Sequence, residues 1–405
     1  MLGILSLLTL AVLIGSSLSA TVGADCRFKI NGDLHKVNQP LYSWPNKYEF
    51  LIPGDDGFVE VPYGYAIQLF CPGSFVAPFE HLTSMKAYCL GAQNFRVEHE
   101  NFMMFNLTHL QCSSWPYYTA RRTGSTCNGG TTLVEVGFEV DGCFLHMMDV
   151  CHDEVDEVTR YVHHKLSPYS SEYQRSVDRP RFIEGDFYQG KNVDQIYTQV
   201  QQQSKFEEIL GDISVTYFDL PKNVYLARGH MSAKVDHIYG NQQRATFFFI
   251  NAAPQWQTFN AGNWERVEDG VRKWVSSNGM YVDCYTGVWG VSSLPNSEGV
   301  YQELYLTFDE SGKGLIPVPK LYFRVVIEPS TKKGIVLIGV NNPHISVEKI
   351  LEEYVLCEDV SDKITWINWT KDDLLLGYSY ACEVEEFRKV VTHLPTFDVS
   401  GGLLY

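Results

Sequence analysis

Positive charge and long apolar runs are both scarce in this sequence. Lys and Arg number 32 against 48 Asp and Glu, which gives a net charge of −16 and argues against a protein that holds nucleic acid by overall attraction. A polyanionic ligand would need a local basic groove. After the first 20 residues, no apolar run reaches transmembrane length without charges. The mature protein is therefore expected to be soluble, with no membrane as a partner.

Residues 1–20 are predicted to form a cleaved secretory signal peptide, although they contain no Lys or Arg. The apolar run from Leu2 to Ile14 ends in small residues and is short for a membrane span of about 20 apolar residues. A signal anchor is the alternative. Ten cysteines follow this segment, an even number that predicts disulfides in a secreted, extracellular protein. Seven precede residue 152 and three follow it, so complete pairing would require a bridge between the two parts.

The length and composition of the remaining chain predict two domains. Residues 21–145 are dense in cysteine and aromatic residues with short alternating runs, which predicts a cysteine-rich, mainly β domain of unknown role. Residues 146–405 mix strand and helix periodicities, which predicts an α+β domain. The tripeptides that begin at Asn106 and Asn368 are predicted glycosylation sites on the surface.

Within the second domain, several segments have a clear local pattern. The apolar run 244–251 predicts a buried strand, and 259–275 has helical character. Residues 320–343 predict a β-hairpin, and 347–357 and 383–391 predict short helices.

Three short blocks between residues 224 and 272 carry the residue types that phosphodiester hydrolysis requires: a base for water, a cation for the charge at phosphorus, and help for the departing oxygen. His230 can be the base, with Arg228 two residues earlier. Asn260 offers an oxygen to a hard cation, and Mg²⁺ accepts one amide oxygen together with several waters. On a helix that begins near Asn260, Trp264 and Glu268 recur every four residues, so Glu268 could orient those waters.

These blocks resemble the signature of the DNA/RNA non-specific endonucleases with a His-Me finger, also called the ββα-metal site. They read Ala-Arg-Gly-His at 227–230, Asn-Ala-Ala-Pro-Gln at 251–255 and Asn-Ala-Gly-Asn-Trp at 260–264, followed by Glu268. The resemblance covers about residues 155–390. Together with the cysteine-rich front and the Ala-Arg-Gly-His variant, the chain is similar to the secreted insect double-stranded-RNA nucleases.

The resemblance implies an α+β His-Me finger domain at 146–405, with an antiparallel central sheet and flanking helices. It also implies a secreted enzyme that hydrolyses RNA, including double-stranded RNA, and DNA to products with 5′-phosphates. His230 would be the general base, Arg228 would stabilise the charge at phosphorus, and Asn260 would hold one Mg²⁺, with Mn²⁺ as a possible substitute. The further residues implied are Glu268 for catalysis, and Asn251, Gln255, Arg179 and Arg181 for support or substrate binding. No protein partner is implied, and the oligomeric state stays open.

Ala227 departs from the family pattern, which commonly has Asp at this position. Its loss weakens the expectation of a strong metal site, but His230, Arg228 and Asn260 are all kept, so activity is still expected. The alternative is a catalytically weak or inactive nuclease fold that binds nucleic acid. A third hypothesis, based on aromatic richness alone, is an exported carbohydrate-binding or structural module within residues 25–145.

Several other residues have ordinary explanations. Trp264 and Phe247–Phe249 are expected in the core rather than as base-stacking platforms, and Asn260 alone could be a helix N-cap. Glu268 and Arg272 stand four apart and could form only a solvated helix pair. Five basic residues near the blocks either line a phosphate groove or are simply exposed: Lys234, Arg244, Arg266, Arg272 and Lys273.

A zinc site upstream of these blocks is disfavoured. Cysteines of exported proteins are usually bridged, and the spacings match no standard zinc signature. The candidate ligands would be His146, Cys151, His152, Asp153, His163 and His164.

Overall fold

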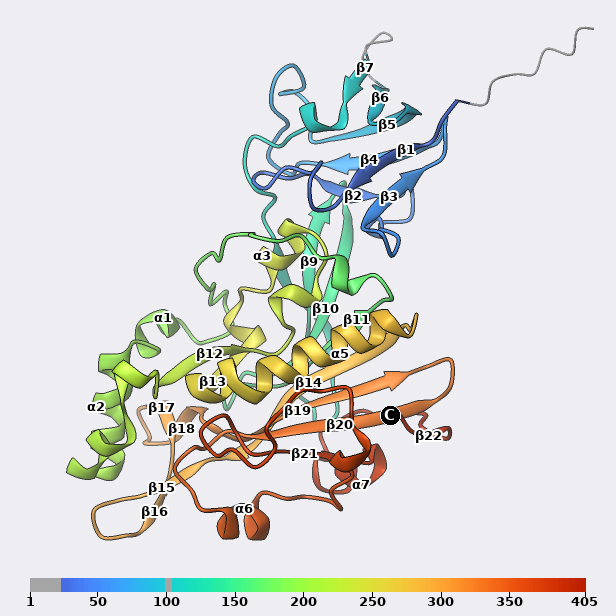
Figure 1. The fold of residues 1–405 in the computed structure, drawn as a ribbon. Coiled ribbons are helices and arrows are strands. Elements are labelled where there is room, and N and C mark those ends of the chain that lie inside the picture. The colour runs from blue at the N-terminus through green and yellow to red at the C-terminus, as the bar shows by residue number, and fades with distance from the viewer. Residues whose placement is uncertain (1–22, 99–103) are drawn as a thin grey trace, which may run out of the picture.

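The computed structural model describes residues 23–98 and 104–405, and the predicted signal peptide lies outside them. Within these residues, no helix is both long and apolar enough to cross a membrane. Strands β1–β7 form the upper part of the molecule in Figure 1, and the remaining elements form the larger lower part. We call the described residues before Thr119 the front domain.

The front domain is built on a five-stranded antiparallel sheet in the order β2-β4-β5-β6-β7, beside the antiparallel pair β1-β3. Alternate residues of β5 are buried, among them Met85, Ala87 and Cys89, as expected for strands with one covered face. The strands are β1 (Cys26–Lys29), β2 (Leu41–Ser43), β3 (Phe58–Val61), β4 (Ala66–Phe70), β5 (Ser84–Gly91), β6 (Asn94–Val97) and β7 (Met104–Asn106).

A nine-stranded sheet dominates the rest of the chain, in the order β21-β20-β19-β14-β11-β10-β9-β8 with β22 beside β20. All neighbours are antiparallel except β20 and β22. The predicted boundary at residues 145 and 146 lies inside β10, and β8 and β9 before it pair in this same sheet. The strands are β8 (Thr119–Thr126), β9 (Thr132–Val140), β10 (Cys143–Asp153), β11 (Val158–Leu166), β14 (Val282–Val291), β19 (Pro319–Glu328), β20 (Lys333–Val340), β21 (Ser379–Cys382) and β22 (Gly402–Leu403).

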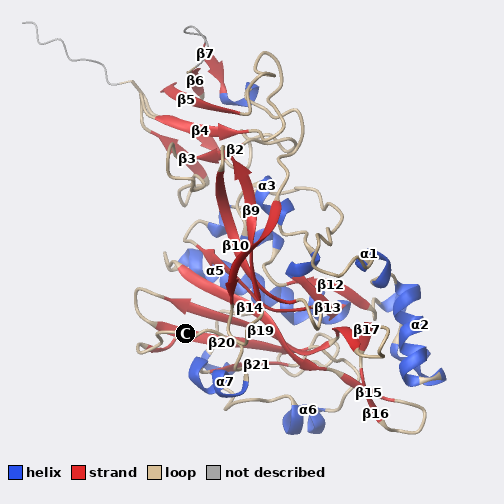
Figure 2. Cartoon of the chain, turned by 180° about the vertical axis from the view of Figure 1, so that it is seen from behind, coloured by secondary structure: helices blue, strands red, loops and turns tan. Residues whose placement is uncertain are grey.

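The centre of this sheet is covered on both faces, which explains why its strands read as continuous apolar runs. On β19, Tyr322 and Val326 join the cluster that contains the Val residues of α5, whereas Phe323 and Val325 join the cluster of α6 and α7. Figure 2 shows these helices against the red strands. The prediction of a mixed α+β chain is confirmed. The helices are α1 (Val193–Ile196), α2 (Gln199–Leu210), α3 (Gly240–Ala245), α4 (Gln257–Phe259), α5 (Glu265–Ser277), α6 (Val347–Glu353) and α7 (Val384–Val390).

Three short antiparallel pairs complete the described elements. They are β12 (Leu226–His230) with β13 (Ala252–Trp256), β15 (Ser293–Pro295) with β16 (Tyr301–Glu303), and β17 (Tyr305–Phe308) with β18 (Gly314–Pro317).

The predicted elements are confirmed where the spacing of apolar residues was clear. The hairpin predicted at 320–343 is β19–β20, and the two short helices are α6 and α7. The strand predicted at 244–251 is wrong: this run ends α3, then forms a turn of 3₁₀ helix at Phe249–Asn251. Its residues are buried as expected. A short apolar run can be a buried strand or a buried helical turn, so the apolar pattern predicted burial but not the backbone conformation.

All ten cysteines lie in the described residues, and eight of them form four disulfides. None of these bridges joins a cysteine before residue 152 to one after it. The bridge that complete pairing would have required is therefore not formed. Cys143 is half-buried and Cys284 is buried, and both are free thiols. The bridges are Cys26–Cys89, Cys71–Cys112, Cys127–Cys151 and Cys357–Cys382.

A chain of alternating His and Asp side chains crosses three strands of the large sheet. His163 on β11 places Nδ1 3.2 Å from Asp149 on β10 and Nε2 2.8 Å from Asp283 on β14. The other oxygen of Asp149 lies 2.9 Å from His146 Nε2. Both ring nitrogens of His163 face carboxylates, so the ring is best satisfied as an imidazolium. Although burial alone would lower it, these hydrogen bonds raise the pKa of His163 above its ordinary value.

The stability contributed by His163 should therefore depend on pH. A raised pKa in the folded state stabilises the fold below the unfolded pKa of about 6.5, and this contribution is lost as pH rises through the folded pKa. We expect His163→Gln to reduce the free energy of unfolding by about 1–3 kcal/mol at pH 5.5–6, and by less at pH 9. Urea unfolding of both proteins across this range measures the difference, with His81→Gln, an exposed front-domain histidine, as control. A difference that does not change with pH would contradict the imidazolium bridge.

Candidate functional site

The first two sequence blocks form the antiparallel pair β12–β13, in which Ala227 pairs with Gln255 and His230 with Ala252. Gly229 is required by close packing. A Cβ at this position would lie 2.2 Å from Gln255 Oε1 and 2.7 Å from the Tyr322 hydroxyl. The glycine between Arg228 and His230 therefore leaves room for the side chains of Gln255 and Tyr322 to pack over β12.

The third block follows β13 directly but is not one regular helix. Residues Asn260–Trp264 form a wide turn between α4 and α5, in which Gly262 departs from helical dihedral angles (φ −108°, ψ −121°). Gly262 lies against Leu376, whose carbonyl oxygen would be 2.8 Å from an added Cβ. The expectation that Asn260, Trp264 and Glu268 share one helix face through a four-residue repeat is thus wrong. Asn260 is also the C-cap of α4 rather than an N-cap.

An open cavity of about 730 Å³ lies where these elements meet the segment from Arg179 to Phe182 and the start of α2. It brings together residues from five separate segments of the sequence. Among its lining residues are Arg179, Arg181, Phe182, Asp194, Tyr197, Ala227, Arg228, Phe247 and Asn260.

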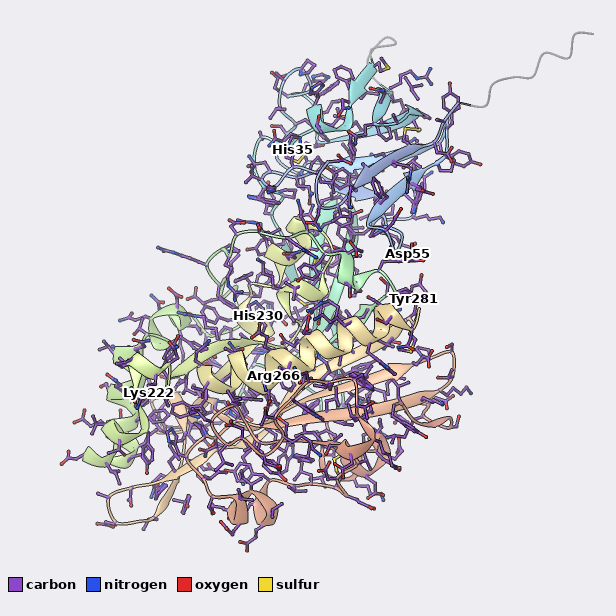
Figure 3. The ribbon with its side chains drawn as sticks, viewed as in Figure 1. His35, Asp55, Lys222, His230, Arg266 and Tyr281 are labelled. Carbon is purple, nitrogen blue, oxygen red and sulfur yellow. A yellow bond between two sulfur atoms is a disulfide. The ribbon has the colours of Figure 1, made fainter. Side chains whose placement is uncertain are left out.

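His230 lies at the end of β12 (Figure 3) and is buried behind the lining of this cavity. Its ring contacts Phe182 and Phe247, with centroids 5.0 Å and 4.8 Å away, and both of these rings line the cavity. Burial, together with the charges of Arg179 and Lys234, lowers the pKa of His230 to about 3. Nε2 has no hydrogen-bond partner among the described residues. The imidazole is therefore neutral near pH 7 and can accept a proton.

Arg228 presents its charge at the cavity wall. Its Nη2 donates to the carboxylate and the backbone oxygen of Asp194, at 2.7 Å and 3.1 Å, and its guanidinium lies over the rings of Tyr197 and Phe249. Arg179 and Arg181 are exposed at the same cavity and form no ion pair with any described residue. Three guanidinium groups therefore converge on one concave surface of an otherwise acidic protein.

Asn260 fits the role of a single protein ligand for a hard cation. Its Nδ2 donates to Gln257 Oε1 at 3.1 Å, so its Oδ1 carries no hydrogen bond from the described part of the chain. The same described residues hold no cluster of three or more His, Cys, Asp or Glu that could bind a metal. One amide oxygen on the wall of a wet cavity suits Mg²⁺, which keeps most of its waters when bound to proteins.

Asn251 and Gln255 support the two strands from inside the core. Asn251 closes the loop after His230, because Oδ1 accepts from Ser232 N while Nδ2 donates to the carbonyls of Ser232 and Thr246. The Gln255 side chain is fully buried over Gly229 and has no partner for either amide atom among the described residues.

Glu268 lies on α5 beside a buried charge network. Burial raises the pKa of Glu268 to about 7, against the opposing charges of Arg324 and Arg272. At the centre of the network, Asp236 accepts hydrogen bonds from His164 Nε2, Arg272 Nη1 and Arg324 Nη2, at 3.0, 3.0 and 3.1 Å. Arg272 is thus buried and bound to Asp236, which excludes the solvated Glu268–Arg272 pair.

Sequence reasoning missed Phe182, Asp194, Asp236 and Arg324. Phe182 directly follows the two predicted arginines, and Arg324 is the one charged residue inside the apolar run 321–327. That interruption was a usable signal, because an arginine in a buried strand needs an acidic partner. Asp194 and Asp236 gave no comparable signal, since their partners lie far away in the sequence.

Among the predicted site residues, Arg179, Arg181, Arg228 and Asn260 line the cavity, whereas His230, Glu268, Asn251, Gln255 and the other basic candidates lie outside its lining. Arg266 binds Asn263 and Thr370, Lys273 binds Asp269, Arg244 binds Asp178, and Lys234 donates to the carbonyl of Val177. Among the zinc candidates, Cys151 is in a disulfide and His152 binds Thr159. Asn368 is exposed and Asn106 is half-buried, where it caps a short 3₁₀ turn. Trp264 and Phe247–Phe249 are buried in the core as predicted.

The paired strands, the adjoining helix and the cationic cavity are the features expected of a nuclease. A model of the DNA/RNA non-specific endonuclease family matches residues 129–387, more than half of the chain, and the chain therefore belongs to this family.

Known proteins similar to this chain include a salivary endonuclease of Lutzomyia longipalpis. It is 28% identical over 356 residues, covering 84% of this chain and 79% of the relative. The salivary protein Tsal1 of Glossina morsitans morsitans is 23% identical, covering 93% of each chain. A crystal structure of an EndoG/EndoGI complex has a TM-score of 0.32 and 20% identity, covering 48% of this chain and 72% of that one.

Gly229 gives a direct test of the packing between the strands. The methyl group of Gly229→Ala would collide with the side chains of Gln255 and Tyr322, so we expect a loss of about 1–3 kcal/mol in the free energy of unfolding, as for other overpacked sites, and a drop in any activity that depends on His230. Gly73→Ala is the control, because its added methyl meets nothing closer than 3.5 Å. Equal thermal stability of the two variants would contradict the close approach.

Proposed function

We propose that this chain is a secreted, Mg²⁺-dependent endonuclease that hydrolyses RNA, including double-stranded RNA, and DNA, leaving 5′-phosphates. The observation that carries the proposal is the neutral His230 beside a cavity lined by Arg228 and Asn260. Family membership supports the nuclease activity itself. The arrangement of β12, β13 and the helix after Asn260 supports a His-Me finger.

In this proposal, His230 takes a proton from a water molecule as the water oxygen bonds to phosphorus. The P–O3′ bond breaks, so one product carries a 5′-phosphate and the other a 3′-hydroxyl that takes its proton from solvent. Arg228 stabilises the negative charge on the phosphoryl oxygens, and Asp194 holds its guanidinium at the cavity wall.

Asn260 would hold the metal through Oδ1, and Glu268 would orient water around it. When bound, Mg²⁺ withdraws charge from a phosphoryl oxygen and from the leaving oxygen. Mn²⁺ has similar oxygen preferences and is expected to substitute. Ala227 lines the cavity without contributing a carboxylate, so the site depends on fewer acidic groups than the commoner family sequence.

Secretion is part of the proposal and has independent support. Four disulfides in one chain are typical of proteins that fold outside the reducing cytosol. The name of one relative also describes a salivary protein with endonuclease activity.

Cleavage of long double-stranded RNA and DNA by the purified protein tests the reaction. We expect His230→Ala to lower kcat by at least about 100-fold, because a general base contributes roughly that much, and Asn260→Ala to do the same by weakening Mg²⁺ binding. Chelation of divalent metal should abolish cleavage by the unaltered protein. His81→Ala, at an exposed front-domain position, should retain full activity.

Equal cleavage by the unaltered protein and His230→Ala would refute this site. Retained nucleic-acid binding with no cleavage under any divalent metal would instead favour an inactive binding protein, in which the loss of Asp at position 227 has disabled the metal site.

The three cavity arginines should make binding depend on salt. Each phosphate contact releases counterions, so Arg179→Ala or Arg181→Ala should reduce the slope of log Kd against log salt by about 1. Filter binding to double-stranded RNA without divalent metal measures this slope. Lys332→Ala, at the exposed β19–β20 turn, is the control. An unchanged slope in both arginine variants would remove this cavity from the binding surface.

A further inference from the structure

The two cavity arginines lie on a segment that the front domain holds in place. We call residues 173–182 the arginine segment. At its beginning, one amide of the front domain binds it twice: Asn31 Nδ2 donates to the carbonyl of Tyr173, and Asn31 Oδ1 accepts from the Arg175 N–H, both at 2.8 Å. These bonds fasten the backbone on both sides of Gln174.

Gln174 makes a second, buried connection between the two parts of the protein. Only 2% of this residue is exposed. Its Nε2 donates to the carbonyl of His35 at 2.9 Å, and its Oε1 accepts from Gln39 Nε2 at 3.1 Å and from Gly240 N at 2.9 Å. One side chain therefore joins the front domain, the arginine segment and the start of α3.

The other end of the arginine segment is fixed beside His230. Phe182 packs on the His230 ring, and the next residue, Ile183, exchanges backbone hydrogen bonds with Phe247 and Phe249 at 3.0 and 2.9 Å. Arg179 lies over the Phe247 ring. In the middle of the segment, the carbonyl of Val177 accepts from Lys234 Nζ and Asp178 pairs with Arg244. The exposed arginines thus lie between contacts with the front domain at one end and contacts beside His230 at the other.

Ordering the backbone of a loop on binding costs about 1–2 kcal/mol per residue. Exposed cations on a loop therefore increase affinity only when their interaction with the substrate exceeds this cost, or when the loop is already ordered. The front domain has no excess of positive charge itself, because residues 23–118 contain six Lys and Arg against nine Asp and Glu. Its contacts with Tyr173, Gln174 and Arg175 instead order the segment before substrate arrives.

We propose that the front domain is a positioning element for nucleic-acid binding, in which Asn31 and Gln174 hold the arginine segment in its binding conformation. This proposal rests on the proposed nuclease function. Asn31 and Gln174 act through Arg179 and Arg181 and touch no reacting atom. The domain therefore affects the affinity for substrate more than the chemical step.

Asn31→Ala tests the proposal because it removes both hydrogen bonds at a half-buried position. We expect KM for long double-stranded RNA to rise roughly 3- to 10-fold, as for the loss of one or two hydrogen bonds, with kcat within about twofold of the unaltered protein and a shallower salt dependence of binding. Gln111→Ala is the matched control, since Gln111 donates only to Val37 within the front domain. A purely structural role would lower thermal stability and leave KM and the salt slope unchanged.

Limited trypsin digestion gives a readout that does not require activity. Trypsin should cut after Arg175 and Arg181 several times faster in Asn31→Ala than in Gln111→Ala, because the segment is no longer ordered. If Asn31→Ala fails to fold, Asn31→Asp retains the acceptor for the Arg175 N–H and allows the same comparison. Equal KM and equal digestion in the Asn31 and Gln111 variants would overturn the proposal. If Asn31→Ala is digested faster but even the unaltered protein cleaves no nucleic acid, the positioning role of Asn31 would stand and the nuclease function would be refuted.

Discussion

A carboxylate buried away from water is stable only when cations or hydrogen-bond donors surround it, and Asp236 meets that condition through three side chains from three elements. His164 comes from β11, Arg272 from α5 and Arg324 from β19, and all are nearly or fully buried. Although burial alone would raise it, the Arg324 charge and the His164 hydrogen bond hold the pKa of Asp236 well below its ordinary value. Removal of any one partner would leave buried polar groups of this network without a hydrogen bond.

This network determines where the candidate site lies, because Asp236 follows His230 by six residues. Arg324 also approaches the carbonyl of Met231, directly after His230, at 3.4 Å. Arg272 ties the same point to α5, the helix that carries Glu268. The strand that carries His230 and the helix that carries Glu268 are therefore both fastened to one buried anion beside the central sheet. Directional hydrogen bonds of this kind specify an arrangement that apolar packing alone leaves adjustable.

The charge distribution fits a protein that must bind and release a polyanion. The net charge is −16, yet three arginines face one cavity. A cationic groove in an acidic surface confines attraction to the place where a phosphodiester would be cleaved. The front domain contributes to this groove by holding the backbone that carries two of the arginines, which explains how a domain without excess positive charge could serve nucleic-acid binding.

Much of the site could be predicted from the sequence, because its residues lie in three short blocks. Arg228 and His230 flank a glycine that strand packing requires, and Asn260 follows in the next element, so local order was enough to propose a base, a cation and an oxygen ligand. The break in the helix between Asn260 and Glu268 could not be predicted from the sequence. Gly262 leaves helical geometry where it meets Leu376, a residue more than 100 positions away.

The sequence by itself determined the three short blocks of the candidate site, the mixed α+β character, and the hairpin at β19–β20, because these depend on local spacing and apolar period. Only the tertiary structure decided that Arg179 and Arg181 join Arg228 in one cavity, that Asp194 orients Arg228, and that Asp236 anchors the site. It also left Cys143 and Cys284 unpaired. Each of these outcomes depends on contacts between residues far apart in the chain, and such contacts leave no periodic signal in the sequence.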